Sequence, residues 1–92
     1  MTFPVYKEIL TEHNSEALLA DGFEDALIGV GEVFSRPPLA VYDRNKCLEI
    51  LMKRDGMTDE EAEEFFTYNV SGSWVGENTP IYVTLFDYWE NQ

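Results

Sequence analysis

Residues 43–66 read DRNKCLEILMKRDGMTDEEAEEFF, a stretch that predicts two consecutive helices. Asp43 can cap the first helix through its side chain, and Gly56 can end it, because glycine readily takes the left-handed conformation that follows many helices. Thr58 and Glu61 have the spacing of a capping box, in which each side chain accepts a hydrogen bond from the other residue's backbone N–H. The stretch therefore indicates a pair of helices with a sharp bend between them.

The apolar side chains of both predicted helices recur at spacings of three and four, so each helix should bury one face. Cys47 is the only cysteine of the chain, which excludes an intrachain disulfide. Its place among apolar neighbours favours a small buried side chain over a nucleophile. The predicted stripe contains Cys47, Leu48, Ile50, Leu51, Met52 and Arg54 in the first helix, and Ala62, Phe65, Phe66 and Asn69 or Val70 in the second.

Strand-like segments lie on both sides of the helix pair. ALIGVGEVF (26–34) and LAVY (39–42) are β-branched and apolar, and the pair Pro37 and Pro38 predicts a turn between them, so we expect a hairpin. The two glycines of the first segment suggest a bulge or the close approach of another backbone. After the helices, IYVTLF (81–86) predicts a third strand that is apolar on both faces.

Helical spacing also predicts a helix over residues 4–20, with a break near Asn14 and Ser15 as an alternative. The order of the elements is then α-β-β-α-α-β. A chain of 92 residues suits one small core, so we expect a single α+β domain over residues 1–92. In this domain, helices pack on a short antiparallel sheet.

The formal net charge is −12, and it is unevenly distributed. Residues 44–54 carry four bases against one acid, whereas residues 55–92 carry nine acids and no base. Such a chain should repel nucleic acids and anionic membranes, so we expect it to bind neither directly. The sequence also lacks an apolar run long enough to span a bilayer and lacks a signal peptide, which favours a cytoplasmic protein.

The acidic run 59–64 suggests a partner of opposite charge. At a rise of ~1.5 Å per residue its carboxylates stand about every 1.5 to 2 Å along the axis, close to the ~1.7 Å per charge of duplex DNA. We therefore predict a non-enzymatic binding module, a possible mimic of nucleic acid, that docks on a basic protein surface. The predicted acidic face consists of Asp59, Glu60, Glu61, Glu63, Glu64, Glu49 and Asp55.

Two alternatives stay open. The chain is rich in aromatic residues, and those near its end could form the interface of a homodimer or another homo-oligomer: Trp74, Tyr82, Phe86, Tyr88 and Trp89. A weaker alternative is a divalent-metal site, because carboxylates next to the predicted strands could converge at one end of the hairpin. Its candidate ligands are Asp21, Glu24, Asp25 and Asp43.

A carboxylate-only site at these four residues is the one enzymatic candidate in the sequence, and no other catalytic motif appears. His13 is the only histidine, which excludes a zinc site built on two or three imidazoles. No phosphate-binding glycine loop with its lysine is present, and Gly29 and Gly31 lack the third glycine of a dinucleotide fingerprint. We therefore predict no catalytic residue, no cofactor and, apart from the weak carboxylate candidates, no metal.

Four segments carry a resemblance to a known group of proteins: DGFEDALIGVG (21–31), YDRNKCLEILMKRDGM (42–57), the following EEAEEFF, and NVSGSWVGENTP (69–80). Over roughly residues 21–83 the chain resembles a family of small, acidic, uncharacterised proteins encoded by tailed bacteriophages and related mobile elements. The resemblance implies no catalytic residue or ligand. It implies an accessory factor that binds host machinery in the bacterial cytoplasm and modulates or inhibits it, for example in host defence.

Overall fold

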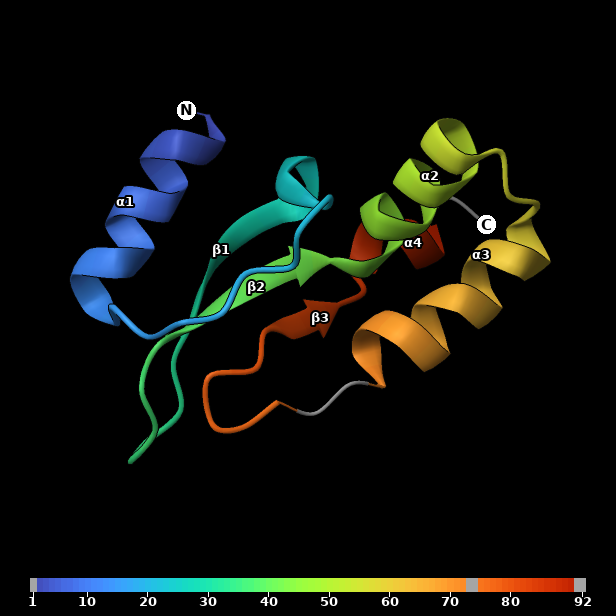
Figure 1. Cartoon of the computed structure of the whole chain (residues 1–92). Coiled ribbons are helices and arrows are strands. Elements are labelled where there is room, and N and C mark those ends of the chain that lie inside the picture. Colours follow the sequence, from blue (N-terminus) through green and yellow to red (C-terminus); the bar gives the residue numbers. More distant parts are fainter. Residues whose placement is uncertain (1, 73–74, 91–92) are drawn as a thin grey trace.

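The computed structural model describes residues 2–72 and 75–90 (Figure 1). The predicted α+β class and the order α-β-β-α-α-β are confirmed, and a short helix follows the last strand. In chain order the elements are α1 (Phe3–His13), the 3₁₀ turn η1 (Glu24–Ala26), β1 (Leu27–Gly31), β2 (Leu39–Asp43), α2 (Arg44–Asp55), α3 (Asp59–Phe66), the π-helical turn η2 (Thr67–Ser71), β3 (Ile81–Val83) and α4 (Phe86–Glu90).

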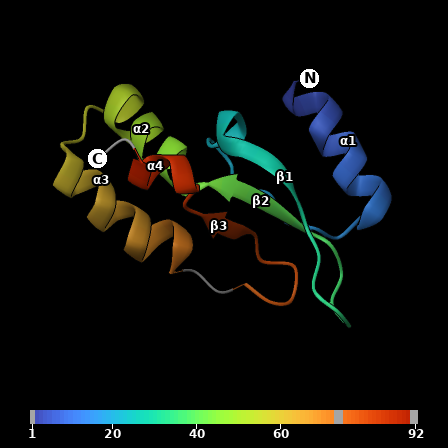
Figure 2. The ribbon, with the colours of Figure 1, turned by 180° about the vertical axis from the view of Figure 1, so that it is seen from behind.

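The three strands form one sheet in the order β1-β2-β3. Figures 1 and 2 show this sheet in the middle of the molecule, with α1 beside β1 and with α2, α3 and α4 at the opposite end. The helices therefore flank the sheet at its two ends. The segment on which the binding prediction depends, residues 59–64, lies in α3, far from the N-terminal helix.

We expected both strand pairs to be antiparallel, but only one of them is. β1 and β2 form the predicted hairpin, whereas β3 runs parallel to β2, with Ile81 opposite Val41 and Val83 opposite Asp43. The sheet is thus mixed rather than antiparallel throughout. The connection explains the difference, because α2 and α3 carry the chain back across the sheet, and a crossover of this length joins parallel strands.

The third strand is also shorter than the predicted 81–86. It ends at Val83, and residues 86–90 form α4 instead. The register gives the reason: Val83 pairs with Asp43, the last residue of β2, which also caps α2. Beyond this point the central strand offers no backbone for residue 84 to pair with.

The bulge that the glycines of β1 suggested is present in the structure. The register between β1 and β2 shifts between Leu27 and Gly29, which marks a bulge. At Gly31 a Cβ atom would lie 2.9 Å from Val41 Cγ2 and 3.1 Å from Ile81 Cδ1, too close for an ordinary contact. Glycine at position 31 therefore leaves room for the side chains of Val41 in β2 and Ile81 in β3.

The first helix was predicted over residues 4–20, but it ends at His13, so the alternative of a break near Asn14 is the correct one and residues 14–20 are not helical. Asn14 is the C-terminal cap of α1, and its Nδ2 donates hydrogen bonds to the Pro38 carbonyl at 2.8 Å and to Asn78 Oδ1 at 2.9 Å. These bonds hold three loops together and compete with continuation of the helix.

Tyr42 of β2 lies at the centre of the core with no exposed surface. Its ring stacks on Tyr82 of β3 at a centroid distance of 5.7 Å, and Tyr82 meets Phe66 of α3 edge to face at 5.1 Å. The Tyr42 hydroxyl accepts a hydrogen bond from the Ala20 backbone N–H at 2.9 Å. Aromatic contacts therefore join both parallel strands to α3.

The substitution Tyr42→Phe should lower the free energy of unfolding by about 1–2 kcal/mol, because the partly buried Ala20 N–H loses its acceptor. Urea denaturation measures this loss. Tyr82→Phe is the matched control, since it removes a hydroxyl from a ring in the same stack but makes no hydrogen bond to a described residue. Equal losses for both variants would contradict this role of the Tyr42 hydroxyl.

Candidate protein-binding surface

The two helices of the crossover begin and end at the predicted residues. Asp43 Oδ1 accepts hydrogen bonds from the backbone N–H groups of Asn45 and Lys46 at 3.0 and 3.2 Å, and Gly56 follows α2 with a φ of 69°. Thr58 and Glu61 form the capping box, with bonds of 3.2 and 2.9 Å. Local side-chain chemistry therefore sets the bend between α2 and α3.

The position of α3 on the core decides which of its acids face outward. Ala62 and Phe66 are fully buried, so they mark the inner side of the helix. Glu60 and Glu64, four residues apart, lie on the opposite side and are exposed. Neither these two nor Asp59 makes an ion pair or a hydrogen bond through its side chain within residues 2–72 and 75–90.

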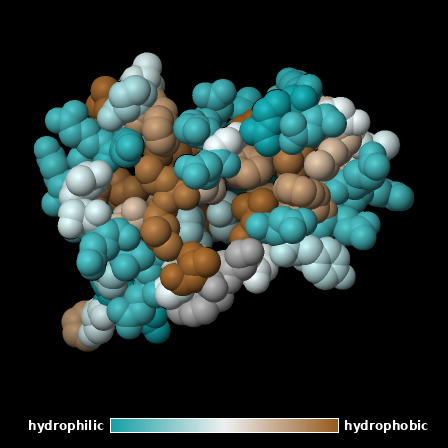
Figure 3. Space-filling model, viewed as in Figure 1, coloured by the Kyte–Doolittle hydropathy of each residue, from teal (hydrophilic) through white to brown (hydrophobic). Residues whose placement is uncertain are grey.

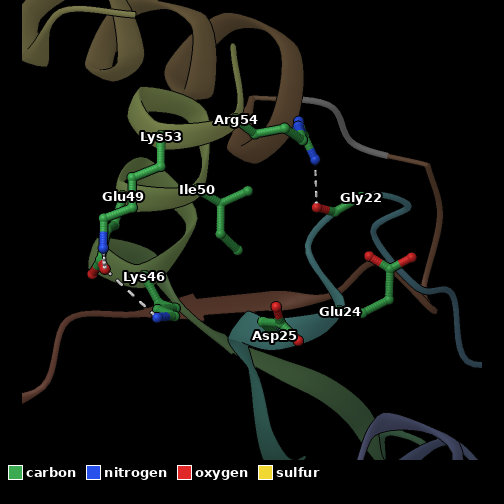
Figure 4. A pocket seen from close by; sticks show the side chains of 8 residues that line it. All are labelled: Gly22, Glu24, Asp25, Lys46, Glu49, Ile50, Lys53 and Arg54. Atoms are coloured by element: carbon green, nitrogen blue, oxygen red, sulfur yellow. Dashed lines mark hydrogen bonds and ion pairs between the residues drawn. The ribbon is translucent and has the colours of Figure 1, made fainter. Parts of the chain in front are cut away.

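The other four residues of the predicted acidic face have internal partners. Glu61 serves the capping box, whose backbone hydrogen bond lowers its pKa. Glu63 pairs with Arg44 of α2. Glu49 accepts a hydrogen bond from Lys53 Nζ at 2.6 Å, which lowers its pKa, and it also pairs with Lys46, as Figure 4 shows.

Asp55, the fourth of these residues, pairs with Arg54: Nη2 of Arg54 lies 3.0 Å from Oδ2 of Asp55, and this hydrogen bond lowers the pKa of the carboxylate. All four bases of residues 44–54 are thus engaged in ion pairs within the molecule. These bases do not neutralise Glu60 or Glu64.

Each arginine of α2 also contacts an aromatic ring. The Arg44 guanidinium lies 5.3 Å from the centroid of Phe66, and that of Arg54 lies 5.5 Å from the centroid of Phe23. Arg54 Nη1 further donates a hydrogen bond to the Gly22 carbonyl at 2.7 Å, shown in Figure 4. In both places a guanidinium lies on a ring and pairs with a carboxylate.

The carboxylates predicted as weak metal ligands are not assembled into a site. Within residues 2–72 and 75–90, no three histidine, cysteine, aspartate or glutamate side chains form a group that could hold a metal ion. Asp43 is occupied by the cap of α2. Glu24 and Asp25 line a groove of about 580 Å³ that Lys46 and Lys53 also line, so protein cations already lie on their side of the molecule (Figure 4).

An aromatic flank completes the outer surface of α3. Phe65, predicted to be buried, is 39% exposed, because Ala62 and Phe66 occupy the inner positions of this short helix, and Tyr68 of η2 is 75% exposed. The two rings line a groove of about 370 Å³ together with Met57, Glu61, Glu64 and Asn69. The α3 face is defined here as Glu60, Glu61, Glu64, Phe65 and Tyr68.

The aromatic part of the α3 face was not predicted from the sequence. The signal was present, because Glu61, Phe65 and Tyr68 follow one another at spacings of four and three, which place them on one flank of a helix. Phe65 was instead assigned to the core. In Figure 3 hydrophilic side chains predominate at the outer edge of the α2–α3 end, with apolar ones among them.

A tight turn supports Tyr68. It belongs to η2, which continues α3 and ends before Gly72. A Cβ atom at Gly72 would lie 2.3 Å from the Thr67 carbonyl oxygen, so only glycine fits there without moving the backbone. The Tyr68 ring thus projects from a π-helical turn whose close backbone packing requires glycine at position 72. Such turns are frequent at functional sites.

The aromatic residues proposed for an oligomer interface fall into three groups. Trp74 lies outside the described residues. Tyr82 is half-buried, and its ring is taken up by Tyr42 and Phe66. Phe86, Tyr88 and Trp89 belong to α4, which buries none of its residues and leaves Phe86 82% exposed.

Cys47 is fully buried, as predicted, and burial raises the pKa of its thiol to about 12. It therefore remains a protonated core side chain at neutral pH.

The capping box gives α3 a pH-dependent stability. The bonds to Thr58 depress the pKa of Glu61 in the folded protein, so its stabilisation is present above the unfolded pKa of ~4.3 and is lost as the pH falls through the folded value. Glu61→Ala should thus destabilise the protein near neutral pH, and the difference from wild type should shrink towards about pH 3. Urea denaturation across this range measures it.

The matched control for this prediction is Glu64→Ala, because Glu64 lies in the same helix but outside its first turn and its carboxylate makes no hydrogen bond to a described residue. Its effect on the free energy of unfolding should change less with pH. The same pH dependence in both variants would mean that general charge repulsion, rather than the capping box, is responsible.

Comparisons with known proteins gave no match to a family model, to a curated protein or to a solved structure. In the described part of the chain, no helix has the length and apolar character needed to cross a membrane.

Proposed function

We propose that this protein is a non-enzymatic binding module whose α3 face docks on a basic surface of another protein. One observation carries the proposal: carboxylates without internal partners lie beside exposed aromatic rings on one helix, while the bases of α2 are held in internal ion pairs. Interfaces combine such elements, since aromatic anchors supply buried area and surrounding charges supply orientation.

The charge of the whole chain supports this function. A net charge of −12 attracts a basic surface over a distance of about one Debye length, which accelerates encounter at low salt. Charge alone gives steering more than affinity. The rings of Phe65 and Tyr68 add the apolar contact that keeps the partner bound after the encounter.

The natural partners of such a face are basic surfaces that otherwise bind nucleic acid. The carboxylate spacing of residues 59–64 resembles that of phosphates along a duplex over a short distance, although Glu63 is partly neutralised by Arg44. The resemblance to bacteriophage accessory proteins suggests that the target belongs to the host bacterium. Blocking a nucleic-acid channel would then modulate or inhibit the host enzyme.

A double charge reversal, Glu60→Lys with Glu64→Lys, tests the proposal. It should weaken binding to a basic partner captured from bacterial lysate at low salt at least about tenfold, because two favourable charges become repulsive. Quantitative pull-down followed by a salt gradient measures the effect. Because neither carboxylate makes an ion pair or a hydrogen bond in the described structure, the variant should remain folded, which circular dichroism checks.

The matched control reverses Glu8 and Glu12 of α1, which are also exposed and four residues apart and also lie outside any ion pair among the described residues. It changes the net charge by the same amount at the other end of the molecule. Retained capture by this control, with loss in the α3 variant, supports the α3 face. Equal loss in both variants would reduce the interaction to unspecific charge attraction and refute the proposal.

A second candidate function, self-association, is favoured by α4. Phe86 and Trp89 are 82% and 56% exposed, and the centroids of their rings lie 6.2 Å apart. Burial of these rings against a second copy would give an assembly whose formation is strengthened by salt, because salt screens the repulsion between two acidic chains. The two functions are compatible, since they use different residues: those of α4 and those of the α3 face.

Sedimentation velocity of the full chain over micromolar concentrations tests this second function. Self-association should appear in the wild type, increase with salt, and be lost in Phe86→Ala with Trp89→Ala. Phe34→Ala is the control, because Phe34 is 95% exposed but lies in the β1–β2 loop. A wild-type protein that stays monomeric at every concentration and salt level would eliminate self-association as a function.

A further inference from the structure

The two arginines of α2 show how this protein holds a guanidinium. Arg44 lies over Phe66 and pairs with Glu63, and Arg54 lies over Phe23 and pairs with Asp55. The ring supplies a face on which the planar cation stacks, and the carboxylate accepts its N–H groups. The same combination of ring and carboxylate thus occurs twice with its arginine in place.

The α3 face contains the combination a third time, without an arginine. Tyr68 and Phe65 line the groove of about 370 Å³ with Glu64 and Glu61, and no lysine or arginine lines it. The Glu64 carboxylate and the Tyr68 ring make no ion pair, hydrogen bond or ring contact within the described part of the chain. This groove therefore offers a cation the surroundings that α2 gives to its own arginines.

We propose that this groove binds an arginine side chain presented by the partner protein, with the guanidinium on the Tyr68 ring and against the Glu64 carboxylate. The inference rests on the proposed function and specifies the chemistry of its partner. Phe65 and Met57 line the same groove and can cover the methylene groups of the arginine. Tyr68 itself lies in the π-helical turn that continues α3, beside the close backbone packing at Gly72.

Arginine is favoured over lysine for a physical reason. A guanidinium is planar and weakly hydrated, so it stacks on a ring and offers a fork of donors to a carboxylate at the same time. A lysine ammonium is compact and strongly hydrated, and it interacts with the groove mainly as a point charge. The α3 face should therefore distinguish two partners of equal charge.

Two labelled peptides of identical length and charge, one with arginine and the other with lysine at every basic position, test the proposal with the full chain. Fluorescence anisotropy should show the arginine peptide binding about two- to fivefold more tightly for each side chain that enters the groove. Tyr68→Leu should remove this preference, because leucine keeps apolar bulk but has no aromatic face. Tyr68→Phe should retain it. Phe34→Leu, which changes an exposed ring elsewhere, should leave it unaltered.

The outcomes separate the inference from the function on which it rests. Equal affinity for both peptides, lost on reversing Glu60 and Glu64, would overturn the arginine site and leave the acidic binding face standing. An arginine preference that survives in a folded Tyr68→Leu variant would also overturn the arginine site. If neither peptide binds the wild type at low salt, the proposed function fails together with the inference.

Discussion

The contacting rings of Tyr42, Tyr82 and Phe66 hold together the part of the molecule that presents α3. Tyr42 lies on the central strand, Tyr82 on the parallel strand beside it, and Phe66 at the inner end of α3. The short third strand has only three residues with which to pair, so the ring contacts of Tyr82 add to its pairing with β2. This contact and the packing of α3 against α2 together orient α3, and with it the outward direction of Glu60 and Glu64.

The charges of the chain are organised around the same helix. The four bases of residues 44–54 are joined to Glu49, Asp55 and Glu63, so the α2 surface is locally balanced. These pairs are exposed and contribute little stability individually. Their larger effect is on the distribution of charge, because the field of the outer α3 carboxylates remains uncompensated. The acidity of this helix is therefore partly structural, at its cap and at Arg44, and partly directed to solvent.

Sequence reasoning identified the features that depend on neighbouring residues. Asp43, Gly56, Thr58 and Glu61 set the bounds of α2 and the start of α3 through local hydrogen bonds and backbone conformation, and all four were recognised. The parallel pairing of β3 and its end at Val83 depend on residues some forty positions away, which no local pattern reports.

In the α3 face too, the features set by neighbouring residues were predicted and those set by tertiary packing were not. Its carboxylates are conspicuous in the sequence, and their outward direction follows from helical spacing. Helical spacing allowed Phe65 a place beside Glu61 and Tyr68, but two adjacent phenylalanines compete for one inner position, and only tertiary packing decides that Phe66 occupies it. The ion pair between Arg44 and Glu63 was hidden for a similar reason, since it joins two helices across nineteen positions.

The location of α3 inside a crossover between parallel strands has a consequence for recognition. Eight residues are too few to remain helical in isolation, so an excised peptide would lose the alignment of rings and carboxylates. The α3 face therefore depends on the folded crossover between β2 and β3. Any molecule that engages it selects the native state, and its binding energy adds to the thermal resistance of the whole domain.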